Sequence, residues 1–509
     1  MESAEAQWHA GRLDELLHWL RRQGARDAAP DLAGLLDWLH RRTGAAVGLL
    51  SGTGETEMAT PGLPADLPEA VRPMLARLAE GRMTSAVTQS GSAQIRLEAL
   101  GTRPPRPVLV AVSERALTRE EASVISHAGH LLPVLRRARE ADEGFRAFER
   151  TAHQLRLAVF VALMTGEPAL ARRMTSGAVP RVLDSGRVRL HLLHCPPHER
   201  DGIARAHQDP SGYHGNGLLL RCPVYDEHLI CLIRDERPLP GTGEPGLAER
   251  LRRLVRDTPG YALGVSLPHP LRATAEAYDQ ARHALAVARN SPGRVVAYEG
   301  QASLAGVLPR QVGARWARGF LRPLRATSTR TVEVTHLALQ FHRGGVAQML
   351  GISRNTVTAH VRRAEEALGL DLRDVRPRAA LALALNIPDD EPAGPAEPGL
   401  TLADVLHTDD APAEWAHTFL EPLRRDGSGR DLRGTLRAWI ETNADAQETA
   451  RRLGRSRATV REHLRVAETL LNRDLMASGS GIHDVVHALH LTGDIPQLLP
   501  HTGAGQPAG

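Results

Sequence analysis

The chain has 509 residues, which is too long for one compact core and predicts three or four domains. It is 42% hydrophobic, 24% charged and 3% aromatic, the composition of a globular protein with cores of Leu, Val and Ala. The net charge of +4 is too small to identify a nucleic-acid binder, and the longest apolar run, residues 157–164, is too short to span a membrane.

All 63 basic residues are arginine, which we attribute to a GC-rich genome rather than to selection for guanidinium chemistry. The three cysteines, Cys195, Cys222 and Cys231, have no CxxC spacing and predict neither a disulfide framework nor a zinc cluster. The first residues lack the cationic and apolar regions of a signal peptide. We therefore expect a cytoplasmic protein without a membrane partner.

Residues 1–145 alternate between helix and strand patterns. Thr118, with Glu121 three residues later, predicts a capping box at the start of a closing helix that runs to about residue 139. The earlier expected elements are a helix at 32–39, strands at 45–50, 94–99 and 107–112, and a turn at 51–54. This order predicts a small α/β sensor domain.

Residues 146–180 predict a helical connector, and residues 181–305 predict a second α/β domain. The expected order is βαββαβ with an additional helix and strand, which indicates a ferredoxin-like sheet with helices on one face. The expected strands are 188–193, 217–221, 229–233, 261–266 and 294–298, and the expected helices are 198–208, 247–256 and 272–290.

The strongest signal is an internal repeat in the C-terminal third. Residues 346–372 align without gaps to residues 449–475, with 14 identities in 27 positions, and residues 316–325 match residues 415–424 at 7 of 10 positions. The repeat predicts two all-α domains at 309–387 and 410–494. A Pro-rich linker at 388–409 separates them, and a disordered tail at 495–509 follows.

Each copy has the pattern of a helix-turn-helix. In the first, Gly351 permits the left-handed turn, Ser353 caps the next helix, and Val357 and Val361 begin an inward apolar stripe. The second copy repeats these features from Gly454. The residues expected to contact DNA are Ser353, Arg354, Asn355, Thr356, Thr358, Arg362, Arg455, Ser456, Arg457, Thr459, Arg461 and Arg465.

The two outward faces differ. Asn355 and Thr358 can contact base edges, whereas the second copy has Ala458 and Arg461 at these positions. We hypothesise that the first copy supplies more base contacts and the second more phosphate contacts. The alternative for either copy is a helical hairpin with solvated arginines.

Residues 353–357, 362–372 and 379–385 resemble the C-terminal helix-turn-helix of PucR/CdaR-type bacterial regulators. Residues 264–266 and 278–285 are similar to the GGDEF-like domain of that family, and residues 1–145 resemble a degenerate GAF domain. The resemblance implies a one-component transcription regulator that binds double-stranded DNA as a homodimer or larger oligomer and responds to a small molecule. The second helix-turn-helix copy departs from the family pattern.

We expect neither catalysis nor a resident cofactor or metal. The segment that corresponds to the GGDEF hairpin, residues 222–228, lacks the glycine pair, and Asp226 with Glu227 fits a turn. Strand alternation separates His191 and Cys195 from His194, which argues against a shared metal site involving these residues and His198. The alternative function is an oligomeric signalling scaffold in which the helix-turn-helix copies mediate protein contacts.

Overall fold

The computed structural model describes residues 15–22, 30–175, 180–209, 213–235, 246–300, 302–387, 400–476, 479–496 and 498–499. The chain forms two compact units, residues 1–151 and residues 152–509.

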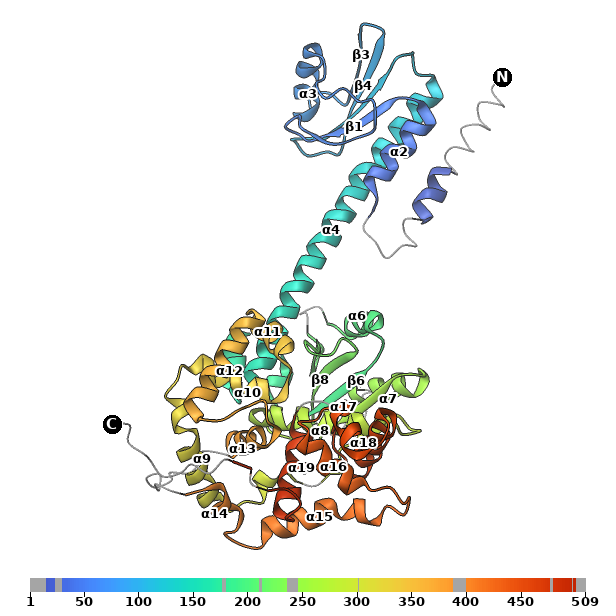
Figure 1. Ribbon diagram of the computed structural model, residues 1–509. Helices are drawn as coiled ribbons and strands as arrows, with labels where there is room; N and C mark the ends of the chain where they lie inside the picture. Colours follow the sequence, from blue (N-terminus) through green and yellow to red (C-terminus); the bar gives the residue numbers. More distant parts are fainter. Residues whose placement is uncertain are drawn as a thin grey trace. The chain divides into compact units, whose positions relative to one another are not determined.

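The first unit is built on a five-stranded antiparallel sheet in the order β2-β1-β5-β4-β3. Helix α2 (Leu32–Thr43) and the start of α4 (Arg119–Met164) cover one face, and α3 (Arg72–Ala79) covers the other (Figure 1). The strands are β1 (Ala46–Leu50), β2 (Thr56–Ala59), β3 (Ser85–Ser90), β4 (Ala93–Ala99) and β5 (Val108–Ser113).

The predicted strands of this unit are confirmed as β1, β4 and β5, and the turn at 51–54 is present. The predicted capping box is also present: the Thr118 hydroxyl accepts from the Glu121 amide at 3.2 Å, and the Glu121 carboxylate accepts from the Thr118 amide at 2.9 Å. Strands β2 and β3 were not predicted, because their side chains are largely exposed and give little apolar alternation.

The predicted connector at 146–180 is not a separate segment. Helix α4 continues without a break through residue 145 to Met164, and a short helix, α5 (Pro168–Met174), follows. Phe160, Leu163 and Met164 are fully or almost fully buried in the main core of the second unit. The start of α4 therefore belongs to the core of the first unit and its end to the core of the second.

The second unit contains a sheet in the order β10-β9-β6-β8-β7, in which only β10 and β9 pair in parallel. The predicted order of strands and helices is confirmed. The elements are β6 (Val188–His194), α6 (Pro197–Ala206), β7 (Gly217–Arg221), β8 (His228–Arg234), α7 (Leu247–Asp257), β9 (Ala262–Val265), α8 (Thr274–Ala288) and β10 (Val295–Ala297).

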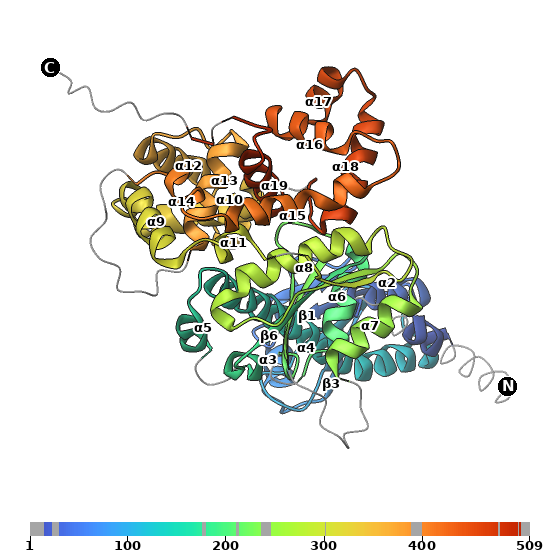
Figure 2. The same ribbon diagram turned by 90° about the horizontal axis from the view of Figure 1, so that it is seen from below.

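The expectation of helices on one face holds only for α6 and α7, which pack on the face that carries Leu193 and Cys231. Helix α8 packs closely on the opposite face. Gly264 of β9 permits this approach, since a Cβ there would lie 2.1 Å from the backbone oxygen of Ala281. Figure 2 shows α8 between this sheet and the C-terminal helices. The extra helix thus gives the all-α region a surface to pack on.

Two five-helix domains complete the second unit. The helices of the first are α9 (Arg310–Arg325), α10 (Thr329–Gln340), α11 (Arg343–Leu350), α12 (Arg354–Leu368) and α13 (Val375–Asn386). A short α14 (Leu402–Leu406) precedes the second set, α15 (Ala411–Arg425), α16 (Leu432–Glu441), α17 (Ala446–Leu453), α18 (Arg457–Leu471) and α19 (Ser480–Leu491).

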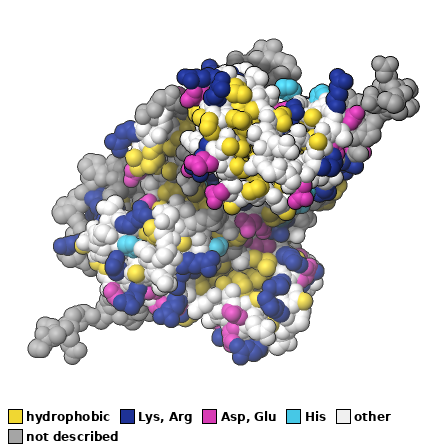
Figure 3. All heavy atoms as spheres, turned by 90° about the horizontal axis from the view of Figure 1, so that it is seen from above, with side chains coloured by type: hydrophobic (Ala, Val, Ile, Leu, Met, Phe, Trp, Pro, Cys, Tyr) yellow, Lys and Arg dark blue, Asp and Glu magenta, His cyan; other side chains and the backbone are white. Residues whose placement is uncertain are grey.

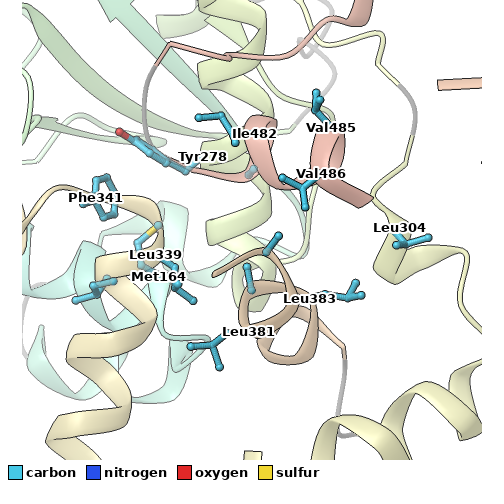
Figure 4. Close-up of a cluster of buried hydrophobic side chains, with 14 of the residues drawn as sticks. Met164, Tyr278, Leu304, Leu339, Phe341, Leu381, Leu383, Ile482, Val485 and Val486 are labelled. Carbon is cyan, nitrogen blue, oxygen red and sulfur yellow. The ribbon is translucent and has the colours of Figure 1, made fainter. Parts of the chain in front are cut away.

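These domains share one core with the sheet domain. Figure 4 shows Met164 and Tyr278 beside Leu381 of the first helical domain and Val485 and Val486 of the second. Helices α13 and α19 lie side by side (Figures 1 and 2). The two helix-turn-helix domains are therefore not separate in packing, since segments separated by more than 300 residues bury the same apolar surface.

Residues 388–399 of the predicted linker and most of the predicted tail lie outside the described residues. The start of that tail is not disordered, because Ile495 and Leu498 are each 3% exposed and belong to the main core. No disulfide joins the three cysteines, all of which are buried. Within the described ranges, no helix combines the length and apolar character needed to cross a membrane.

Candidate nucleic-acid interface

The first helix-turn-helix consists of α11, a three-residue turn and α12. Gly351 ends α11 with φ 63°, and Ser353 begins α12 by accepting a hydrogen bond from the Thr356 amide at 3.0 Å. Val357, Val361 and Ala364 are buried along one side of α12. These features confirm the turn glycine, the cap and the inward stripe predicted from the sequence.

The second helix-turn-helix repeats this geometry. Gly454 has φ 63°, and Ser456 accepts from the Thr459 amide at 3.0 Å. The buried stripe of α18 includes Val460, Leu464 and Ala467. The two copies are therefore the same local structure built from two related sequences.

A side-chain hydrogen bond that was not predicted also recurs in both copies. His360 of α12 bonds to the Thr331 hydroxyl of α10 at 2.9 Å, and His463 of α18 bonds to the Thr435 hydroxyl of α16 at 2.9 Å. Burial lowers the pKa of both imidazoles, with nearby arginines as a further cause. The sequence signal for this bond was the identical histidine in both copies of the repeat. In each copy the bond ties the outward helix to a preceding helix of the same domain.

The outward face of α12 carries the predicted side chains. Arg354, Asn355, Thr358 and Arg362 are all exposed. The Thr358 hydroxyl donates to the Arg354 carbonyl at 3.0 Å, and Arg362 pairs with Glu366 at 3.0 Å. Arg354 and Asn355 thus lie at the amino-terminal end of α12, where a recognition helix meets base edges.

Four of the predicted residues also serve the two helix caps. The hydroxyls of Ser353 and Thr356 lie 2.8 Å apart, as do those of Ser456 and Thr459. Their first role is therefore structural. The exposed Arg363, which was not among the predicted contacts, adds a cation beside Arg362.

The outward face of α18 is cationic but less uniform than predicted. Arg455, Arg457 and Arg465 are exposed, whereas Arg461 is half-buried. Glu462 lies 3.9 Å from Arg465 and reduces the local positive charge. Because Ala458 has no hydrogen-bonding group, the face offers guanidinium groups and little else for base contacts.

Arginine side chains are spread over the face of the molecule that Figure 3 shows. Figure 3 shows dark blue arginine side chains dispersed among acidic and apolar side chains over the visible face. This distribution agrees with the small net charge.

The second domain is anchored on the sheet domain by buried charges. Arg473, which is 1% exposed, donates to the Asp484 carboxylate at 2.7 Å. Both residues belong to the second domain, but the Arg473 guanidinium also lies 5.4 Å from the ring centroid of Tyr298, which follows β10 of the sheet domain. Arg282 of α8 lies 3.4 Å from Asp474. Removing one partner of such a buried pair leaves an uncompensated charge, which is strongly destabilising.

Besides the shared core, the first domain contacts the β7–β8 hairpin of the sheet domain. His342, the N-cap of α11, lies with its Nε2 atom 3.4 Å from the Val224 carbonyl. Gly345 of α11 packs so closely that a Cβ there would lie 2.5 Å from the Val224 side chain. These contacts leave α12 exposed on its outward side.

The fold and the two capped, outward helices define a protein with tandem helix-turn-helix domains. The PucR C-terminal helix-turn-helix domain model matches residues 330–387 and 432–490, so the chain carries this domain twice. Helices α9 and α15 lie outside the matched ranges. These domains indicate DNA-binding transcription regulation.

A relative is known from Thermomonospora curvata, where it is described as an uncharacterized protein in the pkwA 5′ region. The two chains are 33% identical over 145 residues, which is 27% of this chain and 80% of the relative. The chain belongs to the same family as this protein.

Proposed function

We propose that this protein is a cytoplasmic, sequence-specific transcription regulator in which both helix-turn-helix domains of one chain contact double-stranded DNA. The observation that carries the proposal is the exposed, Ser-capped helix found twice in domains of the PucR type. A helix of this kind fits the major groove of B-DNA, with its first residues toward the base edges.

The two faces support a division of labour. Asn355 can form a bidentate contact with adenine, and Arg354 or Arg362 can contact guanine or phosphate. Arg455, Arg457 and Arg465 suit phosphate contacts, which position a protein without specifying sequence. The first domain would then provide most of the sequence preference.

The first unit is proposed as the sensor. A cavity of about 740 Å³ opens beside β1, and its lining combines apolar groups such as Leu50 and Val108 with Asp66 and Arg72. This volume suits a small organic molecule. The sheet with helices on both faces supports the GAF-like assignment, and a small-molecule effector is part of the proposal.

The sheet domain of the second unit is proposed to be ferredoxin-like and non-catalytic, in keeping with the GGDEF-like resemblance. The βαββαβ order and the placement of α6 and α7 on one face support this assignment. We also propose that chains assemble into homodimers or larger oligomers. Within one chain, α13 and α19 already pair the two helix-turn-helix domains.

Genome-wide footprinting of the full chain tests this proposal and reports the site, its spacing and its symmetry. We expect discrete sites with two half-sites contacted per chain, and a gel shift on those sites that weakens steeply with salt. Absence of salt-sensitive DNA binding at low ionic strength would instead favour the scaffold alternative, in which these domains mediate protein contacts.

A further inference from the structure

Two histidines and a glutamate converge at one end of the sheet in the second unit. His194 is the last residue of β6, and His228 is the first residue of β8. The two are register partners across the antiparallel pair, so their side chains lie on the same face. Glu227 precedes His228, and its carbonyl accepts from the Cys195 amide at 2.9 Å, which ties the two strand ends together.

The donor atoms of these three residues form a compact group. One ligand atom from each of His194, Glu227 and His228 lies within 4.8 Å of the other two. Zinc bonds of about 2.1 Å in tetrahedral geometry place ligand atoms about 3.4 Å apart. Small side-chain rotations would therefore bring the three donors to bonding distance.

His228 lacks the hydrogen bonds that a buried polar group normally has. It is 6% exposed, yet neither ring nitrogen has a hydrogen-bond partner among the described residues. The Nδ1 atom of His194 is likewise buried without a partner there. Buried polar groups are seldom left unsatisfied, and coordination of an ion would satisfy these ring nitrogens.

The protonation state suits coordination. Burial is the main cause that lowers the pKa of His228 to about 3, and burial also lowers the pKa of His194. Both imidazoles are therefore neutral at pH 7 and have a lone pair for a metal. The positive charge of Arg289 contributes to the lowered pKa of His194, and the negative charge of Glu227 acts in the opposite direction.

We propose that His194, Glu227 and His228 bind a divalent transition-metal ion, with Zn²⁺ as the reference ion and a water completing its coordination. Two imidazoles and one carboxylate form a ligand set that Zn²⁺ uses, and they select it over Mg²⁺ or Ca²⁺, which prefer oxygen ligands. The sequence pattern drew attention to a different histidine set and gave no sign of this one. Only the β6–β8 register brings Glu227 and His228 beside His194.

The site adjoins the contact between the sheet domain and the first helix-turn-helix domain. The Tyr225 ring centroid lies 4.9 Å from that of His228 and 6.3 Å from that of His342, the N-cap of α11. Val224 of the same hairpin contacts Gly345 of α11. Fixing Glu227 and His228 on a metal therefore restricts the hairpin that supports α11.

Zn²⁺ titration of the full-length chain against a chromophoric chelator tests the site. Glu227→Gln keeps the shape of the half-exposed side chain and removes the anionic ligand. We expect wild type to bind one Zn²⁺ at least about tenfold more tightly than this variant. The matched control is His198→Gln, which alters an exposed histidine beside Glu199 and should leave the affinity unchanged.

Two further measurements depend neither on the folding of a variant nor on DNA binding. Co²⁺ should give the intense visible absorption of a four-coordinate site in wild type, and Zn²⁺ should slow amide exchange in residues 343–350 of α11. Equal Zn²⁺ affinity of wild type and Glu227→Gln, or absence of the Co²⁺ spectrum, would overturn the site. Unchanged exchange in α11 would overturn its link to the first helix-turn-helix domain.

Discussion

The two helix-turn-helix domains share a backbone and differ in how they are held and in what they present. Both have the glycine turn, the serine cap and the histidine–threonine bond. At the position where the first domain has the half-buried Leu370, the second has Arg473, which is buried and paired with Asp484. The duplication thus preserves the residues that make the local fold and changes those that set anchoring and DNA contact.

The largest expected effect comes from breaking the buried Arg473–Asp484 ion pair, which has no counterpart at the aligned position of the first domain. Asp484→Ala leaves the guanidinium of Arg473 buried without its carboxylate, and we expect a loss of about 3–5 kcal/mol in the free energy of unfolding. Urea denaturation of the full chain measures it.

The matched control is Glu366→Ala in the first domain, which removes the exposed Arg362–Glu366 pair. That pair should contribute about 0.5 kcal/mol or less. Equal losses for the two variants would show that the buried Arg473–Asp484 pair contributes no more to stability than the exposed pair.

A pH dependence of stability is expected from α19, which contains buried histidines, whereas α13 has none. Burial lowers the pKa of His487 to about 4, so the folded state binds fewer protons than the unfolded state. The resulting stability is present above pH 6.5 and is lost as the pH falls toward 4, by about 1.4 kcal/mol per pH unit.

His487→Gln tests this assignment, since glutamine can still donate to the Ala379 carbonyl that His487 contacts at 3.2 Å. The unfolding free energy of the variant should fall less steeply between pH 6.5 and pH 5. An unchanged slope would show that His487 does not control acid stability.

The caps should behave alike in the two domains, because both serine hydroxyls accept at 3.0 Å. Ser353→Ala and Ser456→Ala should each lower the unfolding free energy by about 1 kcal/mol. Asp at either position restores an acceptor and serves as the control. A difference above about 1 kcal/mol between the two alanine variants would contradict the equivalence of the caps.

Much of the local structure of the helix-turn-helix domains could be predicted from the sequence, because turns and caps depend on residues close together in the chain. Gly351, Ser353, Gly454 and Ser456 determine their turns and caps within a few residues. The shared core could not be predicted, since apolar side chains such as Val486 do not specify their partners. The same holds for His228, whose significance depends on strand register.

The smallest expected effect concerns phosphate contacts by the second domain. Arg457→Ala should weaken binding about equally for all DNA sequences and reduce the slope of log affinity against log salt by about 1. Fluorescence anisotropy over a salt series measures the slope. Arg173→Ala, at an exposed arginine of α5, is the control and should leave it unchanged. A loss of base preference in Arg457→Ala would reverse the roles assigned to the domains.

We propose that one chain binds DNA through two unequal helices, of which the first contacts bases. Comparison of wild type with Asn355→Ala tests this most directly. The measurement is the affinity of each for a selected site and for each single base-pair change in it. We predict that wild type loses about 1–3 kcal/mol on changing the contacted base pair and that Asn355→Ala loses this discrimination there while still binding DNA. A full set of base preferences retained by Asn355→Ala, or no DNA binding by wild type, would contradict the proposal.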